Sequence, residues 1–246
     1  MHHVAMPPAN IISARLDSVT LPPLVRPPVG PNEEPTLELV TWAGRYYAYS
    51  SIAHVRNILR GLLVLATSGN VETMFLVERH LYEWTMHAVF IQQNFKRHLV
   101  ALNLQAIWEM FEEADTANGW IRRHGAKYVS EIPTDEFPDT LRVKRLVAAY
   151  EKCQADRGEI PSVQDDYGYL SEHSHANAAC FLPYRVFKGR QVSFSAAPLR
   201  YELAGIAHAA TLEWLVAIRN ILGTSKEDAV RQQFSEILNT IAKELK

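Results

Sequence analysis

The sequence predicts an all-α protein: a helical bundle of about seven helices with one small β-hairpin and an extended proline-rich N-terminal arm. Apolar residues recur at helical spacing through most of the chain beyond Leu37, and a single pair of short alternating runs interrupts that pattern. Prolines are concentrated in the segment before Leu37, with eight of the 13 in residues 1–35. Apolar residues make up 48% of the 246 and charged residues 21%, which is ordinary for a globular domain.

Residues 1–40 are expected to form the arm, and residues 41–246 a single helical domain. Proline lacks an amide donor and restricts the residue before it, so a run this rich in proline disfavours regular helix and central strand. The arm is therefore expected to be extended or disordered. It is interpreted either as a loose tail or as a polyproline segment lying along a partner.

The first three helices of the domain are expected at about residues 42–67, 71–95 and 96–117. The first ends before Gly69, which supplies a left-handed cap. The second is apolar on several faces, as a buried central helix would be. Its main apolar stripe consists of Val77, Leu81, Trp84, Ala88 and Ile91.

The C-terminal half is predicted to hold four more helices and the hairpin. One helix ends before Gly158, and a capping box between Ser162 and Asp165 opens the next. The runs 184–187 and 191–195 flank a basic glycine turn and indicate a β-hairpin. Two helices follow, one ending before Gly223 and one amphipathic to the C-terminus.

Composition narrows the function classes. The net charge is −2, so a nucleic-acid partner is the less favoured alternative: the local basic clusters would have to be segregated on one face. The two cysteines, Cys153 and Cys180, are no disulfide framework and indicate a reducing compartment. No apolar run approaches the length of a membrane span, and the N-terminus lacks a signal-peptide pattern. A cytoplasmic location without membrane attachment is expected.

One candidate metal site lies on the predicted central helix. His80, Glu83 and His87 are spaced i, i+3 and i+7, so they project from one side of a helix. Two imidazoles and a carboxylate are ligands for zinc or iron. Three ligands from one helix are cramped, however, and hydrogen-bonded histidines are the favoured interpretation. No cofactor is therefore expected, with this trio as the alternative.

The segment 165–175 offers a second candidate. Ser171 and His175 are i, i+4 neighbours, so the serine is either an activated nucleophile or one half of a structural hydrogen bond. Glu172 and His175 form one Glu-x-x-His pair, but a carboxylate-bridged di-iron bundle needs two such pairs. The structural interpretation of Ser171 and His175 is favoured, because no orienting acid or oxyanion hole is visible.

A family resemblance joins the two segments. The motif Arg79-x-x-x-Glu83, followed by Tyr167-x-x-Leu170-Ser171-x-x-x-His175 and the Lys188-Gly189-Arg190 turn, resembles a bacterial all-helical family, the domain of unknown function 5677. The likeness covers about residues 42–222. It implies an all-helical fold and a polar cluster made of Arg79, Glu83, Tyr167, Ser171 and His175. Members often continue His-Pro, whereas Ala176 follows the histidine here.

Two functions follow from these residues. The favoured one is a non-enzymatic interaction or regulatory module, of the kind found in bacterial defence or stress operons, with a protein partner or a second copy in a homodimer. The alternative is a hydrolase acting on a nucleotide or nucleic acid. In it His175 is the general acid or base, Arg79 holds an anionic group, Glu83 orients a neighbour, and Ser171 attacks or donates. A bracing ion pair between Arg79 and Glu83 is the structural counterpart.

Overall fold

The structure is a computed structural model, and it describes residues 7–28, 34–111, 143–174, 185–188, 191–194, 197–223 and 229–244. The all-α prediction is confirmed, because these residues are overwhelmingly helical. Seven helices and two strands have defined bounds: α1 Pro7–Ser18, α2 Leu37–Ser68, α3 Val71–Val100, α5 Val143–Asp156, α6 Val163–Ser174, β1 Arg185–Lys188, β2 Gln191–Phe194, α7 Ala197–Leu222 and α8 Ala229–Glu244. With the helical residues 104–111, the described ranges hold eight helices.

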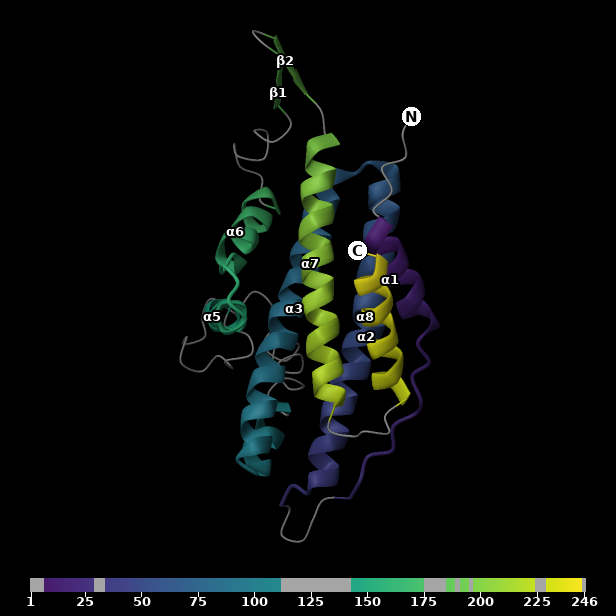
Figure 1. Ribbon diagram of the computed structural model, residues 1–246, viewed down its shortest axis with the longest axis vertical. Coiled ribbons are helices and arrows are strands. Elements are labelled where there is room, and N and C mark those ends of the chain that lie inside the picture. The colour runs from purple at the N-terminus through teal and green to yellow at the C-terminus, as the bar shows by residue number, and fades with distance from the viewer. Residues whose placement is uncertain are drawn as a thin grey trace, which may run out of the picture.

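The centre of the bundle is the pair α3 and α7, which run side by side along its length (Figure 1). Helices α1 and α8 cover one flank and α5 and α6 the other (Figure 1). The predicted central helix is confirmed, since α3 packs against α2, α5, α6 and α7. Trp214 of α7 is fully buried, and its Nε1 donates to Ser51 of α2 at 2.8 Å.

The α2–α3 hairpin forms where the sequence predicts a stop. Gly69 adopts φ 78°, and its N–H donates to the carbonyl oxygen of Leu65. A residue with a side chain rarely adopts that φ, which is why glycine stands there. Asn70 then caps α3 by accepting from the Thr73 amide at 3.1 Å. The two helices lie antiparallel across a connection of only two residues.

The boundary predicted after α3 was wrong. We expected the helix to end near Phe95, but α3 continues to Val100. The break falls at Leu102, whose φ is 53°, and helix resumes at residue 104. Asn103 starts that helix, because its Oδ1 accepts from the Ala106 amide at 3.0 Å. The remainder of the predicted helix, from residue 112 to residue 117, lies outside the described residues.

The N-terminal segment also differs from the expectation of an extended arm. Residues 7–18 form helix α1, with Pro7 and Pro8 in its first turn, where a missing N–H breaks no helical hydrogen bond. Ile12 and Leu16 are fully buried, and α1 contacts α2, α7 and α8. Arg56 of α2 donates to the carbonyl oxygens of Leu16 and Val19. Hydrophobic burial and this cationic cap at its C-terminal end stabilise α1.

The two strands pair antiparallel, from Arg185 opposite Phe194 to Lys188 opposite Gln191. They lie beyond one end of the bundle, next to the start of α7 (Figure 1). The turn residues 189–190 lie outside the described residues. Within the described ranges, none of the helices combines the length and apolar character that crossing a membrane requires.

Candidate functional site

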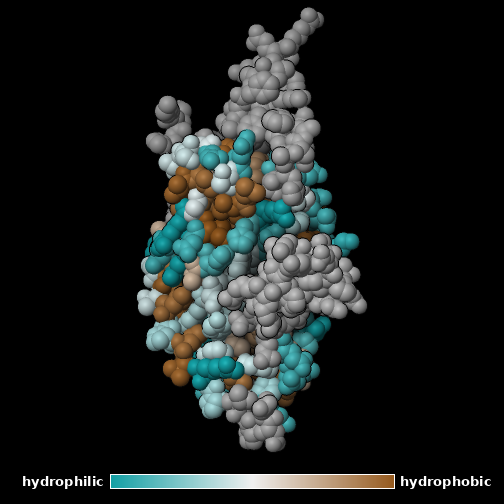
Figure 2. All heavy atoms as spheres, turned by 180° about the vertical axis from the view of Figure 1, so that it is seen from behind, coloured by the Kyte–Doolittle hydropathy of each residue, from teal (hydrophilic) through white to brown (hydrophobic). Residues whose placement is uncertain are grey.

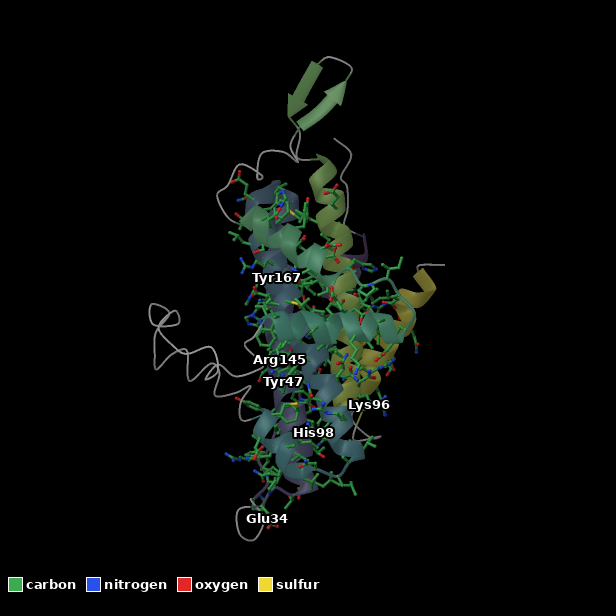
Figure 3. All side chains as sticks on the ribbon, turned by 90° about the vertical axis from the view of Figure 1, so that its left-hand side faces the viewer. Glu34, Tyr47, Lys96, His98, Arg145 and Tyr167 are labelled. Atoms are coloured by element: carbon green, nitrogen blue, oxygen red, sulfur yellow. The ribbon has the colours of Figure 1, made fainter. Side chains whose placement is uncertain are left out.

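The polar cluster implied by the family resemblance is built on α3 and α6. Arg79 and Glu83 are one turn apart on α3, and Arg79 Nε donates to Glu83 Oε1 at 3.1 Å. Tyr167 reaches them from α6. Its hydroxyl donates to the same Glu83 oxygen at 3.1 Å and accepts from an Arg79 guanidinium nitrogen at 3.2 Å. The guanidinium carbon also lies 5.5 Å from the Tyr167 ring centroid. Figure 3 labels Tyr167 and looks onto the flank that α5 and α6 cover.

The charges in this cluster are held in place. Burial alone would raise the pKa of Glu83, but hydrogen bonds from His80 and Tyr167 and the Arg79 charge outweigh it and lower that pKa. The hydrogen bonds with Tyr167 and Glu83 likewise outweigh burial and raise the pKa of Arg79. Burial and the Glu83 charge raise the pKa of the Tyr167 phenol. The result is a charged ion pair between Arg79 and Glu83 that is bridged by a neutral phenol. The Tyr167 phenol donates a hydrogen bond to Glu83 and stays protonated at neutral pH.

The two remaining residues of the predicted site stand differently. Ser171 lies one turn beyond Tyr167 on α6 and is half-buried. His175 lies outside the described residues, so its place beside Ser171 stays a prediction. The structure thus brings together Arg79, Glu83 and Tyr167. The cluster ties α6 to the central helix α3, and this structural role alone accounts for its hydrogen bonds.

The alternative metal trio does not converge on one point. His87 Nδ1 lies 2.8 Å from the Tyr47 hydroxyl of α2, and burial lowers the His87 pKa to about 4. His80 points elsewhere, with its Nε2 3.0 Å from His54 Nε2. In the part of the chain that the structure describes, no group of three or more His, Cys, Asp or Glu side chains is arranged to hold a metal ion.

A second polar link between α3 and α6 was only partly foreseen. We predicted that Ser162 would pair with Asp165, but its hydroxyl donates to Asp166 Oδ2 at 3.1 Å. The Tyr82 hydroxyl of α3 donates to the same oxygen at 3.1 Å. Ser162, the residue before α6, therefore also holds the Asp166 carboxylate that accepts from Tyr82. Tyr82 lies on α3 one turn after Glu78 and next to Glu83.

Sequence reasoning missed Glu78, the residue before Arg79. Its side chain is 1% exposed, and neither carboxylate oxygen has a hydrogen-bond partner. Burial raises the pKa of Glu78 well above the usual range, so its carboxyl stays protonated when the pH equals the ordinary pKa of glutamate. In the sequence Glu78-Arg79 resembles an exposed charged pair, and no periodic signal marks one member as buried.

A groove lies apart from the polar cluster, between residues 23–27 and the first turns of α2. Arg26 stands 5.6 Å from the ring centroids of both Trp42 and Trp108. The groove is lined by Leu37, Trp42 and Arg45 from α2 and shares no residue with the polar cluster. The cluster is therefore not the lining of this groove.

Comparisons with protein-family models, curated proteins and solved structures find no match for this chain. The resemblance carried by Arg79, Glu83 and Tyr167 accordingly stays a prediction.

Proposed function

We propose that the chain is a non-enzymatic helical interaction module that pairs with a second copy of itself through the exposed apolar end of the α2–α3 hairpin. The observation that carries this proposal is the exposure of Val64 on α2, at 68%, and of Leu76 on α3, at 52%. We call these two residues, with their half-buried neighbours Leu63 and Leu65, the hairpin-end surface. Figure 2, which views the molecule from behind relative to Figure 1, shows hydrophobic residues gathered near one end.

An apolar surface of this kind is costly in a monomer and typical of an association site. A second copy is the simplest occupant, since homo-oligomers with two-fold symmetry bury the same patch of both chains. The open space around Gly61 supports a flat approach, because a Cβ added there would meet no atom within 4 Å. The proposed pairing therefore places the ends of four helices, two from each copy, against one another.

The polar cluster supports a structural rather than a chemical role. Each of the Arg79, Glu83 and Tyr167 polar groups already has a partner within the cluster. A general base must instead present a free lone pair near a substrate proton. We interpret the cluster as a brace that fixes α6 on α3. The chain has only two cysteines, which favours a cytoplasmic location for the protein.

Charge substitution on the hairpin-end surface tests the pairing. The double variant Val64→Glu with Leu76→Glu should elute as a monomer of 27.9 kDa, measured by chromatography with light scattering. The matched control is Val100→Glu with Ile160→Glu, which changes two side chains of 80% and 88% exposure on other parts of the molecule. The control variant should keep the dimer mass that we predict for the unmodified protein. Equal masses for both double variants would rule out this surface as the interface.

A second function is favoured by one observation: Arg79 and Glu83, two of the four residues of the hydrolase alternative, meet on α3, and Tyr167 of α6 joins them. In that proposal His175 acts as general acid or base and Ser171, one turn beyond Tyr167, attacks or donates. The test is hydrolysis of nitrophenyl phosphate monoesters and diesters by the parent chain and by His175→Ala. Turnover lost in a variant with an unchanged circular dichroism spectrum supports a site there. No turnover by the parent chain removes the hydrolase proposal.

A further inference from the structure

The seam between α2 and α3 follows a regular register. The Tyr47 hydroxyl of α2 lies 2.8 Å from His87 Nδ1 of α3. Seven residues further along α2, His54 Nε2 lies 3.0 Å from Nε2 of His80, which is seven residues back along α3. Seven residues make about two turns of an α-helix, so residues at this spacing face the same way. The next step of the register therefore leads to positions 61 and 73.

The seam has a hollow at this next step. Gly61 is half-buried, and a Cβ added to it would meet no atom within 4 Å. Thr73 stands opposite, so neither helix carries a large side chain at this level. Glycine inside a helix is destabilising relative to alanine, and no contact within the chain requires it at position 61. The hollow therefore suits a side chain that comes from another molecule.

Two exposed apolar side chains border the hollow. Val64 lies one turn beyond Gly61 on α2, and Leu76 lies one turn beyond Thr73 on α3. Side chains on a helix lean towards its N-terminal end. Because the two helices are antiparallel, Val64 leans away from the hairpin end and Leu76 leans towards it. Both side chains therefore lean towards the level of the hollow.

We propose that Leu76 of each copy fills the hollow over Gly61 of the other copy, around a two-fold axis that runs along the α2–α3 seam. This inference rests on the pairing proposed above. Rotation by 180° about such an axis keeps the level along the hairpin and exchanges its two helices. Leu76 of one copy then lies over α2 of the other, at the level of Gly61. Because the interface is isologous, the same contact forms twice.

The charges on the two flanks of the hairpin fit the same axis. Arg60 lies on the α1 side of α2, where its guanidinium is 2.9 Å from Asp17, and its side chain is still 57% exposed. Glu72 is exposed and lies two turns before Arg79, which donates to Tyr167 of α6. The cation is thus on one outer flank and the anion on the other. Exchange of the helices places Arg60 of each copy beside Glu72 of the other, which makes the two surfaces complementary in charge.

Filling the hollow tests the contact with Leu76. By sedimentation equilibrium, Gly61→Leu should weaken dimerisation about tenfold or more, because the new side chain takes the space of the incoming leucine. The thermal unfolding midpoint, measured where the parent is monomeric, should not fall, since leucine is the better helix former and its Cβ meets no atom within 4 Å. Gly205→Leu in α7 is the matched control: a Cβ there also meets nothing, and its dimer should dissociate as the parent dimer does.

Charge reversal tests the axis. Arg60→Glu and Glu72→Arg should each weaken self-association, because each brings like charges together twice in its own homodimer. An equimolar mixture of the two variants should regain the dimer mass by light scattering, because the mixed dimer pairs opposite charges at both contacts. Mixing cannot repair an effect that a substitution has within its own chain, so recovery is specific to the interface.

The outcomes separate this inference from the pairing itself. If the parent is a dimer but Gly61→Leu dimerises as tightly as the parent, the contact with Leu76 is overturned. If the mixture of charge variants stays monomeric, the axis is overturned. In both cases the pairing is decided separately by Val64→Glu with Leu76→Glu. A parent that is monomeric at every concentration overturns the pairing and this inference together.

Discussion

The Tyr167 hydroxyl of α6 donates to Glu83 of α3 at 3.1 Å, and this bond joins residues that are 84 positions apart in the chain. Arg79 completes the contact from one turn earlier on α3, by donating to both residues. The three groups are half-buried and satisfy one another. Their arrangement fixes where α6 lies on the central helix, and it therefore also positions Ser171, one turn further along α6.

Removing the Tyr167 hydroxyl tests whether this contact stabilises the fold. Tyr167→Phe keeps the ring but leaves Glu83 and Arg79 one hydrogen bond short, so we expect a loss of about 1–2 kcal/mol in the free energy of unfolding. Urea denaturation measures it. Tyr46→Phe is the control, because the Tyr46 ring is 44% exposed and stacks on Trp42 without a described hydrogen bond. Equal stabilities for the two variants would contradict the brace.

Glu78 makes stability depend on pH in a defined direction. Its folded-state pKa is raised by burial, so its contribution is full below the unfolded-state pKa, near the ordinary glutamate value, and falls as pH rises towards the folded-state pKa. Glu78→Gln cannot ionise. Relative to the parent it should gain about 1 kcal/mol or more between mildly acidic and mildly alkaline pH, since one pKa unit corresponds to about 1.4 kcal/mol.

Urea unfolding across that pH range is the measurement for Glu78. The control is Glu236→Gln, on the exposed side of α8, which should follow the parent at every pH. A constant difference between Glu78→Gln and the parent would mean that Glu78 titrates normally in the folded chain.

His87 makes the opposite contribution in acid. Burial lowers its folded-state pKa to about 4 from an ordinary value of 6.5. The stability it contributes is present above pH 6.5 and is lost as pH falls towards 4, because the unfolded chain binds the proton first. The ring keeps some solvent exposure, so we expect about 2 kcal/mol rather than the full value of about 3 kcal/mol for such a shift.

The variant His87→Gln isolates this effect. Its stability should fall less steeply than that of the parent between neutral pH and pH 4, as followed by urea unfolding. His98→Gln, on the last turn of α3, should restore much less. Parallel curves for His87→Gln and the parent would show that His87 accepts a proton freely in the fold.

Arg56 tests the docking of α1. Arg56→Ala removes two charged hydrogen bonds to the carbonyl oxygens of Leu16 and Val19, so we expect a loss of about 1–3 kcal/mol. Proteolysis within residues 19–28 should also become faster. Arg60→Ala is the control: it removes an exposed ion pair with Asp17, which contributes less than about 1 kcal/mol. Equal protease sensitivity of the two variants would contradict the capping role of Arg56.

The bundle could be predicted because its signals are local. Helical periodicity fixed the class of fold, and Gly69 marked the end of α2 because only glycine readily adopts its φ. Helix α1 was missed because proline was weighed by number rather than by position. Pro7 and Pro8 stand in the first turn, where proline is tolerated, and Ile12 and Leu16 bury the helix behind them.

The candidate site was predictable only in part. Arg79 and Glu83 are helical neighbours, so spacing alone places them together. Tyr167 came from the family resemblance, because no local pattern connects residues 88 positions apart. Glu78 and the His54–His80 pair could not be predicted at all. Burial of one glutamate, or the facing of two histidines on different helices, depends on how α2, α3 and their neighbours rotate against each other.

The central claim, that two copies of this chain pair through the hairpin-end surface, is tested most directly by the mass of the full chain in solution. Light scattering coupled to chromatography, over a series of micromolar concentrations, measures it. We predict twice the monomer mass of 27.9 kDa, with a shift towards the monomer on dilution. A mass of 27.9 kDa at every concentration would contradict the claim, and the exposed Val64 and Leu76 would then require a different partner.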